Sequence, residues 1–244
     1  VRLSKIYRQA ESSHIVLNAH KINAGELITL DNKNKDFFFF EKKDVRSVMG
    51  ALVYLVKTRL PEYIGASPFE IQVLTPMRKG ELGVEHLNEV LQYYLNPASE
   101  SKKEKEGRTG VFREGDKVMQ VKNNYKLEWK ITNAKGFSIE EGLGVFNGDM
   151  GIIKQINTYS ERITVVFDEN REAEYPFSSL DELELAYAIT IHKSQGSEYP
   201  AVVLPLLSGP PILCNRNLLY TAIIHNETEQ KRYSGLNDCL KEGL

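Results

Sequence analysis

The run Ile71-Gln72-Val73-Leu74-Thr75-Pro76 is apolar at its start and ends in two turn-forming residues. It predicts a short buried strand that ends at Thr75 and Pro76. A helical pattern follows, with apolar residues three and four positions apart from Val84 to Leu95 and with Pro97 closing it. A buried strand followed by an amphipathic helix is typical of an α/β layer, in which helices cover a sheet.

The residues before this strand predict further elements of the same kind. Residues 1–28 are compatible with a short strand or loop that leads into a helix, with Ser12 or Ser13 as its cap. The aromatic run Phe37–Phe40 predicts a buried strand. The order strand, helix, strand, helix supports an α/β domain.

A helix is also predicted between this aromatic run and the strand at Ile71. Apolar residues recur at helical spacing from Val45 to Val56. Asp44 is the expected amino-terminal cap, because a carboxylate there accepts from backbone N–H groups that have no helical partner. Pro61 is the expected end of the helix, because proline lacks the N–H that continues the ladder.

Past Leu95 the pattern changes from helices to short strands. Residues 99–107 are almost entirely polar and predict a solvated linker. Beyond it, Asp168-Glu169-Asn170 predicts a hairpin turn, in which Asp168 and Glu169 form the turn rather than act in acid–base chemistry. The expected strands on either side of this turn are Asp116 to Val121, Gly148 to Ile156, Arg162 to Phe167 and Glu172 to Pro176.

Signals for buried elements return at Leu183. Residues 201–204 predict a fully buried strand, and residues 215–224 predict a helix. The sequence therefore predicts a small all-β module inserted into an α/β domain. The expected boundaries are residues 1–110 for the first part of the α/β domain, 111–182 for the module and 183–244 for the second part.

The composition limits what this chain can be. Its 244 residues suit one large or two modest domains, and its formal net charge of -2 lacks the strong positive field of a dedicated nucleic-acid binder. No apolar run approaches the roughly 18 residues that cross a bilayer. Two cysteines without paired spacing argue against a disulfide scaffold or a cysteine zinc site and favour the cytoplasm. A first residue of Val1 suggests a fragment or processed chain.

The stretch from Tyr187 to Glu198 concentrates polar groups beside an apolar run. Thr190, Lys193 and Ser194 are able to donate to phosphate oxygens, and the glycine in the stretch, Gly196, lets a backbone approach a ligand. An ordinary element end with a solvated tip is the competing interpretation. The chain has no G-x-x-x-x-G-K-[ST] sequence, so the backbone cradle and lysine of a P-loop are absent from it. It also has no paired ligand spacing, and we expect no metal site held by the protein.

This stretch, YAITIHKSQGSE, resembles motif V of superfamily 1 helicases of the RecD type, also called exodeoxyribonuclease V alpha subunit-like. Other segments resemble the same enzymes in the same order: Tyr7-Arg8-Gln9-Ala10 with the residues up to Gly25 (motif IV), Val73 to Gly80, and Asn217 to Ala222 (start of motif VI). Phe112 to Met119 and Val145 to Gly151 are similar to the SH3-like barrel of those enzymes. The resemblance implies a RecA-like parallel-sheet domain with an inserted SH3-like β-barrel.

The resemblance also implies residues for one side of a nucleotide site. Arg8 matches the motif IV arginine that reaches the γ-phosphate of ATP, and Gln9 lies beside it. Gly196 and Glu198 match positions near the nucleotide, with Glu198 as the partner of the ribose. Mg²⁺ is expected to be held mainly by a first RecA-like domain that this chain lacks. Without the resemblance, a solvated surface arginine is the favoured interpretation of Arg8, and a solvent-facing glutamate is the alternative for Glu198.

The single-stranded DNA path is expected at the carboxyl end of the strand at Ile71. The resemblance and the chemistry of hydroxyl and basic groups assign phosphate contacts there. The residues assigned are Thr75, Pro76, Arg78, Thr190, His192 and Lys193. The alternatives are a plain strand-ending turn and solvated basic side chains. Tyr125 and Trp129 are candidates for base stacking, but burial in the small barrel is the favoured interpretation.

One departure from the family pattern bears on activity. His225 stands where motif VI has its γ-phosphate arginine, and a neutral imidazole cannot provide the same bidentate fork. We expect the carboxyl-terminal motor domain of an ATP-dependent 5′-to-3′ DNA helicase of recombination or repair, inactive without its first domain. Nuclease or helicase subunits of a recombination complex are possible partners. The alternative is a non-catalytic single-stranded DNA-binding or adaptor module.

Overall fold

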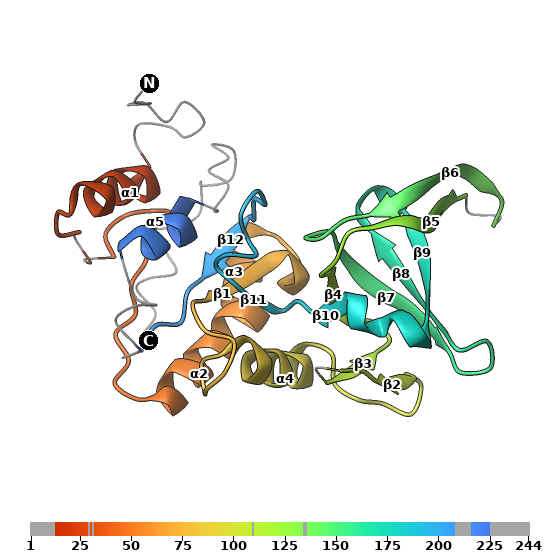
Figure 1. The fold of residues 1–244 in the computed structure, drawn as a ribbon. Helices are drawn as coiled ribbons and strands as arrows, with labels where there is room; N and C mark the ends of the chain where they lie inside the picture. The colour runs from red at the N-terminus through yellow and green to blue at the C-terminus, as the bar shows by residue number, and fades with distance from the viewer. Residues whose placement is uncertain are drawn as a thin grey trace, which may run out of the picture. The chain divides into compact units, whose positions relative to one another are not determined.

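A computed structural model describes residues 13–28, 30, 32–108, 110–133, 136–207 and 216–224. The chain forms two compact units, the first from residues 1–78 with 190–244 and the second from residues 79–189 (Figure 1). The second unit extends beyond the expected module at residues 111–182, because a helix, a small hairpin and a strand also pack within it.

The first unit contains β1 and β12 of a three-stranded sheet with the order β11-β1-β12, and the division between the units falls within β11. β1 (Ile71–Thr75) is buried along its whole length and pairs in parallel with β12 (Ala201–Val203). β11 (Ala188–Thr190) is the third strand. The predicted strand at Ile71 is confirmed, whereas the full burial predicted for residues 201–204 is wrong, because Val202 and Val203 are half-buried.

Four α-helices accompany this sheet within the described residues of the first unit. α1 packs against α5 (Figure 1), and both helices contain buried apolar residues. Ser13 and Asp44 accept from backbone N–H groups at the starts of α1 and α2, so both predicted caps are confirmed. The helices are α1 (His14–Ala24), α2 (Val45–Tyr54), α3 (Leu60–Ile64) and α5 (Arg216–Ile224).

Two predictions for this unit are wrong. The helix continues beyond Pro61 to Ile64, because a π-helical turn at Leu55–Arg59 shifts the hydrogen-bond ladder before the proline. The run Phe37–Phe40 is not a strand. Its backbone pairs with the Asn32 side chain, which accepts from the Phe39 N–H (2.6 Å) and donates to the Phe39 carbonyl (2.7 Å).

The second unit contains a seven-stranded antiparallel sheet with the order β10-β4-β7-β8-β9-β5-β6 (Figure 1). The predicted bounds of β8 and β9 are confirmed, and Glu169 and Asn170 turn between them at φ 60°. β5 and β6 were not predicted from the sequence. The strands are β4 (Lys117–Gln120), β5 (Asn124–Thr132), β6 (Ser138–Val145), β7 (Met150–Asn157), β8 (Arg162–Phe167), β9 (Glu172–Pro176) and β10 (Leu183–Leu185).

The same unit includes α4 (Val84–Leu95) and a hairpin of β2 (Glu104–Glu106) and β3 (Val111–Arg113). The predicted helix is confirmed, but the predicted linker at residues 99–107 is wrong in part, since it contains β2. One of its charged side chains, that of Lys105, contacts a ring. The ammonium of Lys105 lies 4.5 Å from the ring centre of Phe177.

Candidate nucleic-acid and nucleotide interface

Two predicted DNA-contacting segments meet at the carboxyl end of β1. The Ile191 N–H donates to the carbonyl of Thr75 (N···O 3.1 Å), which places the residue after β11 beside the last residue of β1. The Thr75 hydroxyl accepts from the Met77 N–H (3.3 Å) and so shapes the turn that leaves the strand. Segments more than 100 residues apart in the sequence thus share one edge of the sheet.

The chain after β11 closes into a compact turn. The Lys193 N–H donates to the carbonyl of Thr190 (2.9 Å). The Ser194 hydroxyl donates to the carbonyl of Ile191 (2.7 Å), and the Ser194 side chain is fully buried. The idea that Ser194 donates to a phosphate is therefore wrong, because its hydroxyl proton is used inside the turn.

The turn leaves other groups accessible to a ligand. His192 and Glu198 are exposed, and Thr190 and Lys193 are half-buried. Gly196 adopts φ 91° and has no atom within 4 Å of the place where a side chain would begin. A ligand can therefore approach this backbone closely, as the prediction for Gly196 requires.

The residues on the β1 side differ in exposure. Thr75 and Pro76 are buried, and Arg78 is exposed. Thr75 and Pro76 therefore lie in the protein interior, whereas the Arg78 side chain is exposed to solvent.

Other predicted site residues lie outside the described residues. These are Arg8, Gln9 and His225, so their roles stay predictions. Among the residues that the structure describes, no group of three His, Cys, Asp or Glu side chains could hold a metal ion. In the same part of the chain, no helix has the length and apolar character needed to cross a membrane.

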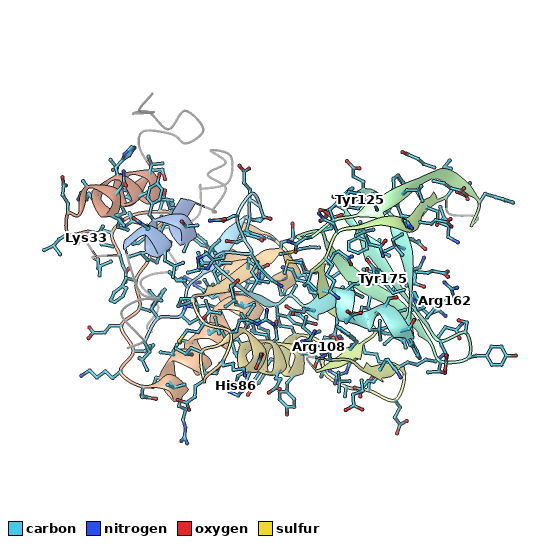
Figure 2. The ribbon with its side chains drawn as sticks, viewed as in Figure 1. Lys33, His86, Arg108, Tyr125, Arg162 and Tyr175 are labelled. Carbon is cyan, nitrogen blue, oxygen red and sulfur yellow. The ribbon has the colours of Figure 1, made fainter. Side chains whose placement is uncertain are left out.

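The aromatic candidates on β5 have different surroundings. Tyr125 is 67% exposed, and its ring contacts that of Phe146 edge-on at a centroid distance of 5.6 Å (Figure 2). The burial favoured for Tyr125 from the sequence is wrong. Trp129 is half-buried, with the Arg171 guanidinium 5.7 Å from its ring centre. Its indole lies over Gly142, where a Cβ would come within 2.3 Å of the ring.

The sequence did not identify Asn88 as a residue that supports this site. Asn88 lies on α4, is 5% exposed, and bonds to the backbone of Leu185 and Ala188 at the start of the motif V segment. A polar residue beside the apolar stripe of a helix was the available signal, but it is equally typical of a solvated face.

Comparisons with known proteins identify both parts of the chain. Residues 87–167 match the model of the SH3 domain of ATP-dependent RecD-like DNA helicases, and residues 185–223 match that of the UvrD-like helicase C-terminal domain. The predicted resemblance to RecD-type helicases is confirmed. Two successive segments of the chain are thus similar to a RecD-like SH3 domain and to part of a helicase C-terminal domain.

The chain is also similar to curated RecD proteins over most of its length. The chain is 33% identical over 223 residues to the ATP-dependent RecD2 DNA helicase of Deinococcus radiodurans, covering 91% of this chain and 27% of that protein. It is 29% identical over 159 residues to the RecBCD enzyme subunit RecD of Mycolicibacterium smegmatis, covering 65% of this chain and 24% of that subunit. The chain thus spans about a quarter of the length of these relatives.

A solved structure supports the fold. The crystal structure of Bacteroides Pif1 bound to ssDNA matches 93% of this chain and 50% of its own chain, with a TM-score of 0.51 and 18% identity. Together with the SH3 match, this confirms the predicted fold class, a RecA-like α/β domain with an inserted SH3-like barrel.

Proposed function

We propose that this chain is the carboxyl-terminal motor domain of an ATP-dependent 5′-to-3′ DNA helicase that acts in recombination or repair in the cytoplasm. The observation that carries the proposal is the hydrogen bond from the Ile191 N–H to the Thr75 carbonyl (3.1 Å). It joins two segments that resemble DNA-contacting motifs at the carboxyl end of a parallel strand, where open α/β sheets bind ligands.

The nucleotide half of the proposal uses residues of the motif V turn. The open backbone at Gly196 and the exposed carboxylate of Glu198 fit the approach of a nucleotide and its ribose. ATP bound there would supply the free energy of phosphoryl transfer. Arg8 and Gln9 would complete this half-site. A first RecA-like domain would supply the P-loop and hold Mg²⁺, so the 244-residue chain alone should not hydrolyse ATP.

Single-stranded DNA is the proposed substrate that binds at the carboxyl end of β1. Arg78, His192 and Lys193 would contact phosphates, which gives binding without sequence preference. Subunits of a recombination complex are further proposed partners, because one relative is a RecBCD subunit.

The second candidate is a single-stranded DNA-binding or adaptor module without motor activity. The observation that favours it is His225 in place of the motif VI arginine. Both candidates bind DNA, but only the motor should turn over ATP. A RecA-like first domain supplied in trans should gain DNA-stimulated ATPase activity from this chain if it is a motor domain. An unchanged rate with both proteins folded would support the adaptor.

DNA binding is tested first on the 244-residue chain. Fluorescence anisotropy with labelled oligothymidylate should give an affinity that falls with salt, with a log–log slope of about -0.7 per phosphate contact. Arg78→Ala should reduce the magnitude of this slope by about 0.7, whereas Arg46→Ala, an equal charge change at an exposed position of α2, should not. A salt-independent affinity, or equal effects of the two variants, would refute the proposed phosphate contacts.

A further inference from the structure

Helix α4 carries a row of three amide side chains that are buried. Asn88, Gln92 and Asn96 follow one another at four-residue spacing, so they lie on one face of the helix and its carboxyl-terminal cap. They are 5%, 8% and 3% exposed. Buried amides need hydrogen-bond partners, and those of this row lie in three other segments of the second unit, at Lys102, at residues 111–116 and at residues 185–188.

The first member of the row holds the backbone that leads into motif V. The Asn88 amide donates to the carbonyls of Leu185 (3.0 Å) and Ala188 (2.9 Å), and its oxygen accepts from the Ala188 N–H (2.8 Å). Three backbone groups are thus satisfied by one side chain. Ala188 is the first residue of β11 and lies two residues before Thr190.

The other two amides meet the fully buried carboxylate of Asp116. Asn96 donates to its Oδ1 (2.6 Å) and Gln92 to its Oδ2 (2.6 Å). The Tyr187 hydroxyl donates to Oδ1 (2.9 Å), and the Arg113 N–H donates to Oδ2 (2.6 Å). Both oxygens therefore accept two hydrogen bonds, an arrangement that suits an ionised carboxylate.

Burial raises the pKa of Asp116, while the bonds from Asn96, Arg113, Gln92 and Tyr187 oppose that rise. Burial and the nearby Asp116 charge raise the pKa of Tyr187, so its phenol keeps the proton that it donates. Asp116 also directly precedes β4, and Tyr187 is the first residue of the YAITIHKSQGSE segment. One carboxylate thus connects α4, the barrel and the start of motif V.

We propose that Asn88 and Tyr187 are positioning residues that fix the backbone at the start of the motif V segment, and that the affinity of the chain for DNA depends on this fixed start. The proposal rests on the DNA-binding function proposed above. Asn88 holds the backbone of Ala188 by hydrogen bonds. The residue before it, Tyr187, is held by the hydrogen bond from its hydroxyl to Asp116. The path of the chain into Thr190 is therefore fixed on both sides of the Tyr187–Ala188 peptide bond.

The test compares two buried tyrosines of the second unit. Tyr187→Phe removes the hydroxyl that donates to Asp116 and keeps the ring. Tyr175→Phe is the matched control, because the Tyr175 hydroxyl is also buried and donates to Gln120 Oε1 (2.8 Å) within the barrel (Figure 2). Hydrogen–deuterium exchange on the 244-residue chain measures the opening of residues 188–198, and anisotropy measures oligothymidylate affinity.

We expect exchange in residues 188–198 to become about tenfold faster in Tyr187→Phe, the factor for one lost hydrogen bond of about 1.4 kcal/mol. DNA affinity should fall severalfold in the same variant, and Tyr175→Phe should change neither quantity. Equal exchange in both variants would overturn the proposal, as would faster exchange with unchanged affinity. Asn88→Ala tests the same segment through its backbone contacts should Tyr187→Phe not fold.

The experiments distinguish failure of the proposed DNA-binding function from failure of the positioning role of Asn88 and Tyr187. If the wild-type chain binds no oligonucleotide, the proposed DNA-binding function is wrong. The exchange comparison then still decides whether the network positions the motif V segment, because it requires no ligand.

Discussion

Replacing Asn88 by alanine should lower the free energy of unfolding of the second unit by about 3 kcal/mol. The change removes three hydrogen bonds, two to the carbonyls of Leu185 and Ala188 and one from the Ala188 N–H. Each bond contributes about 1 kcal/mol net, and a buried group left without a partner costs about 1–3 kcal/mol. The higher helix propensity of alanine returns about 0.6 kcal/mol. A loss of about 3 kcal/mol therefore lies near the lower end of the range, which begins at about 2.4 kcal/mol.

The matched control is Glu89→Ala, one position further along α4. Glu89 is exposed and pairs only loosely with His86, at 3.7 Å. It gains less helix propensity than Asn88→Ala does, because glutamate is already a good helix former, and it loses no buried contact. Urea unfolding should be followed by tryptophan fluorescence, because the chain's single tryptophan, Trp129, lies in the second unit and reports on that unit.

The expected result is a difference of about 3 kcal/mol between the two variants, with equal m-values. A difference below about 1 kcal/mol would refute the reasoning. It would mean that water or a shifted side chain satisfies the backbone of Leu185 and Ala188 as well as Asn88 does, and that the amide row of α4 is not a structural requirement.

Two further predictions concern other parts of the chain. Gly142→Ala should cost about 1–3 kcal/mol and shift the emission of Trp129, because the new Cβ would lie 2.3 Å from its ring. The control is Gly50→Ala in α2, where no atom lies within 4 Å of the new Cβ, and it should be neutral or stabilising in urea unfolding. Equal losses of stability in the two variants would contradict the contact between position 142 and Trp129. Hydrogen bonds from the Ser47 hydroxyl and N–H hold the pKa of Asp44 below its usual range. Its contribution to α2 is therefore present above about pH 3.9 and lost as pH falls through the lowered folded value. An acid titration by circular dichroism should be flatter for Asp44→Asn, and identical titrations would contradict this cap.

Much of the fold follows from local patterns in the sequence. β1, α4, β8 and β9 were predicted because each combines a clear period with a proline or turn signal at its end. The caps at Ser13 and Asp44 were likewise predictable from residue type. Such elements depend on interactions between residues that are close in sequence.

The errors have two different causes. β5 alternates apolar and polar residues from Tyr125 to Ile131, so its strand is a local signal that was missed, whereas Glu141 and two glycines interrupt the alternation in β6, which pairs with β5. The Phe37–Phe40 run has strand propensity, but the Asn32 side chain takes the hydrogen bonds that a neighbouring strand would make. The structure at Phe37–Phe40 therefore depends on a side chain outside the run and not on the local pattern.

The candidate site shows the same division. The polar motif V stretch was recognisable from the sequence, but the internal use of Ser194 depends on the fold of the turn. The buried amides of α4 have the helical spacing expected of a solvated face. Only the positions of Leu185, Ala188 and Asp116 show that this face is a buried polar seam.

The buried amide row of α4 also explains why the domain boundary expected from the sequence, at residue 110, differs from the division of the structure between Arg78 and Lys79. The match to the RecD-like SH3 domain begins at residue 87, inside α4, so sequence comparison also assigns most of this helix to the barrel. A fragment of residues 111–182 would bury Asp116 without Gln92, Asn96 or Tyr187, leaving a desolvated carboxylate with one of its four donors. A fragment of residues 79–189 keeps all four. We therefore expect cooperative urea unfolding for the longer fragment and none for the shorter one, and equal stabilities would show that α4 is not part of the barrel's folding unit.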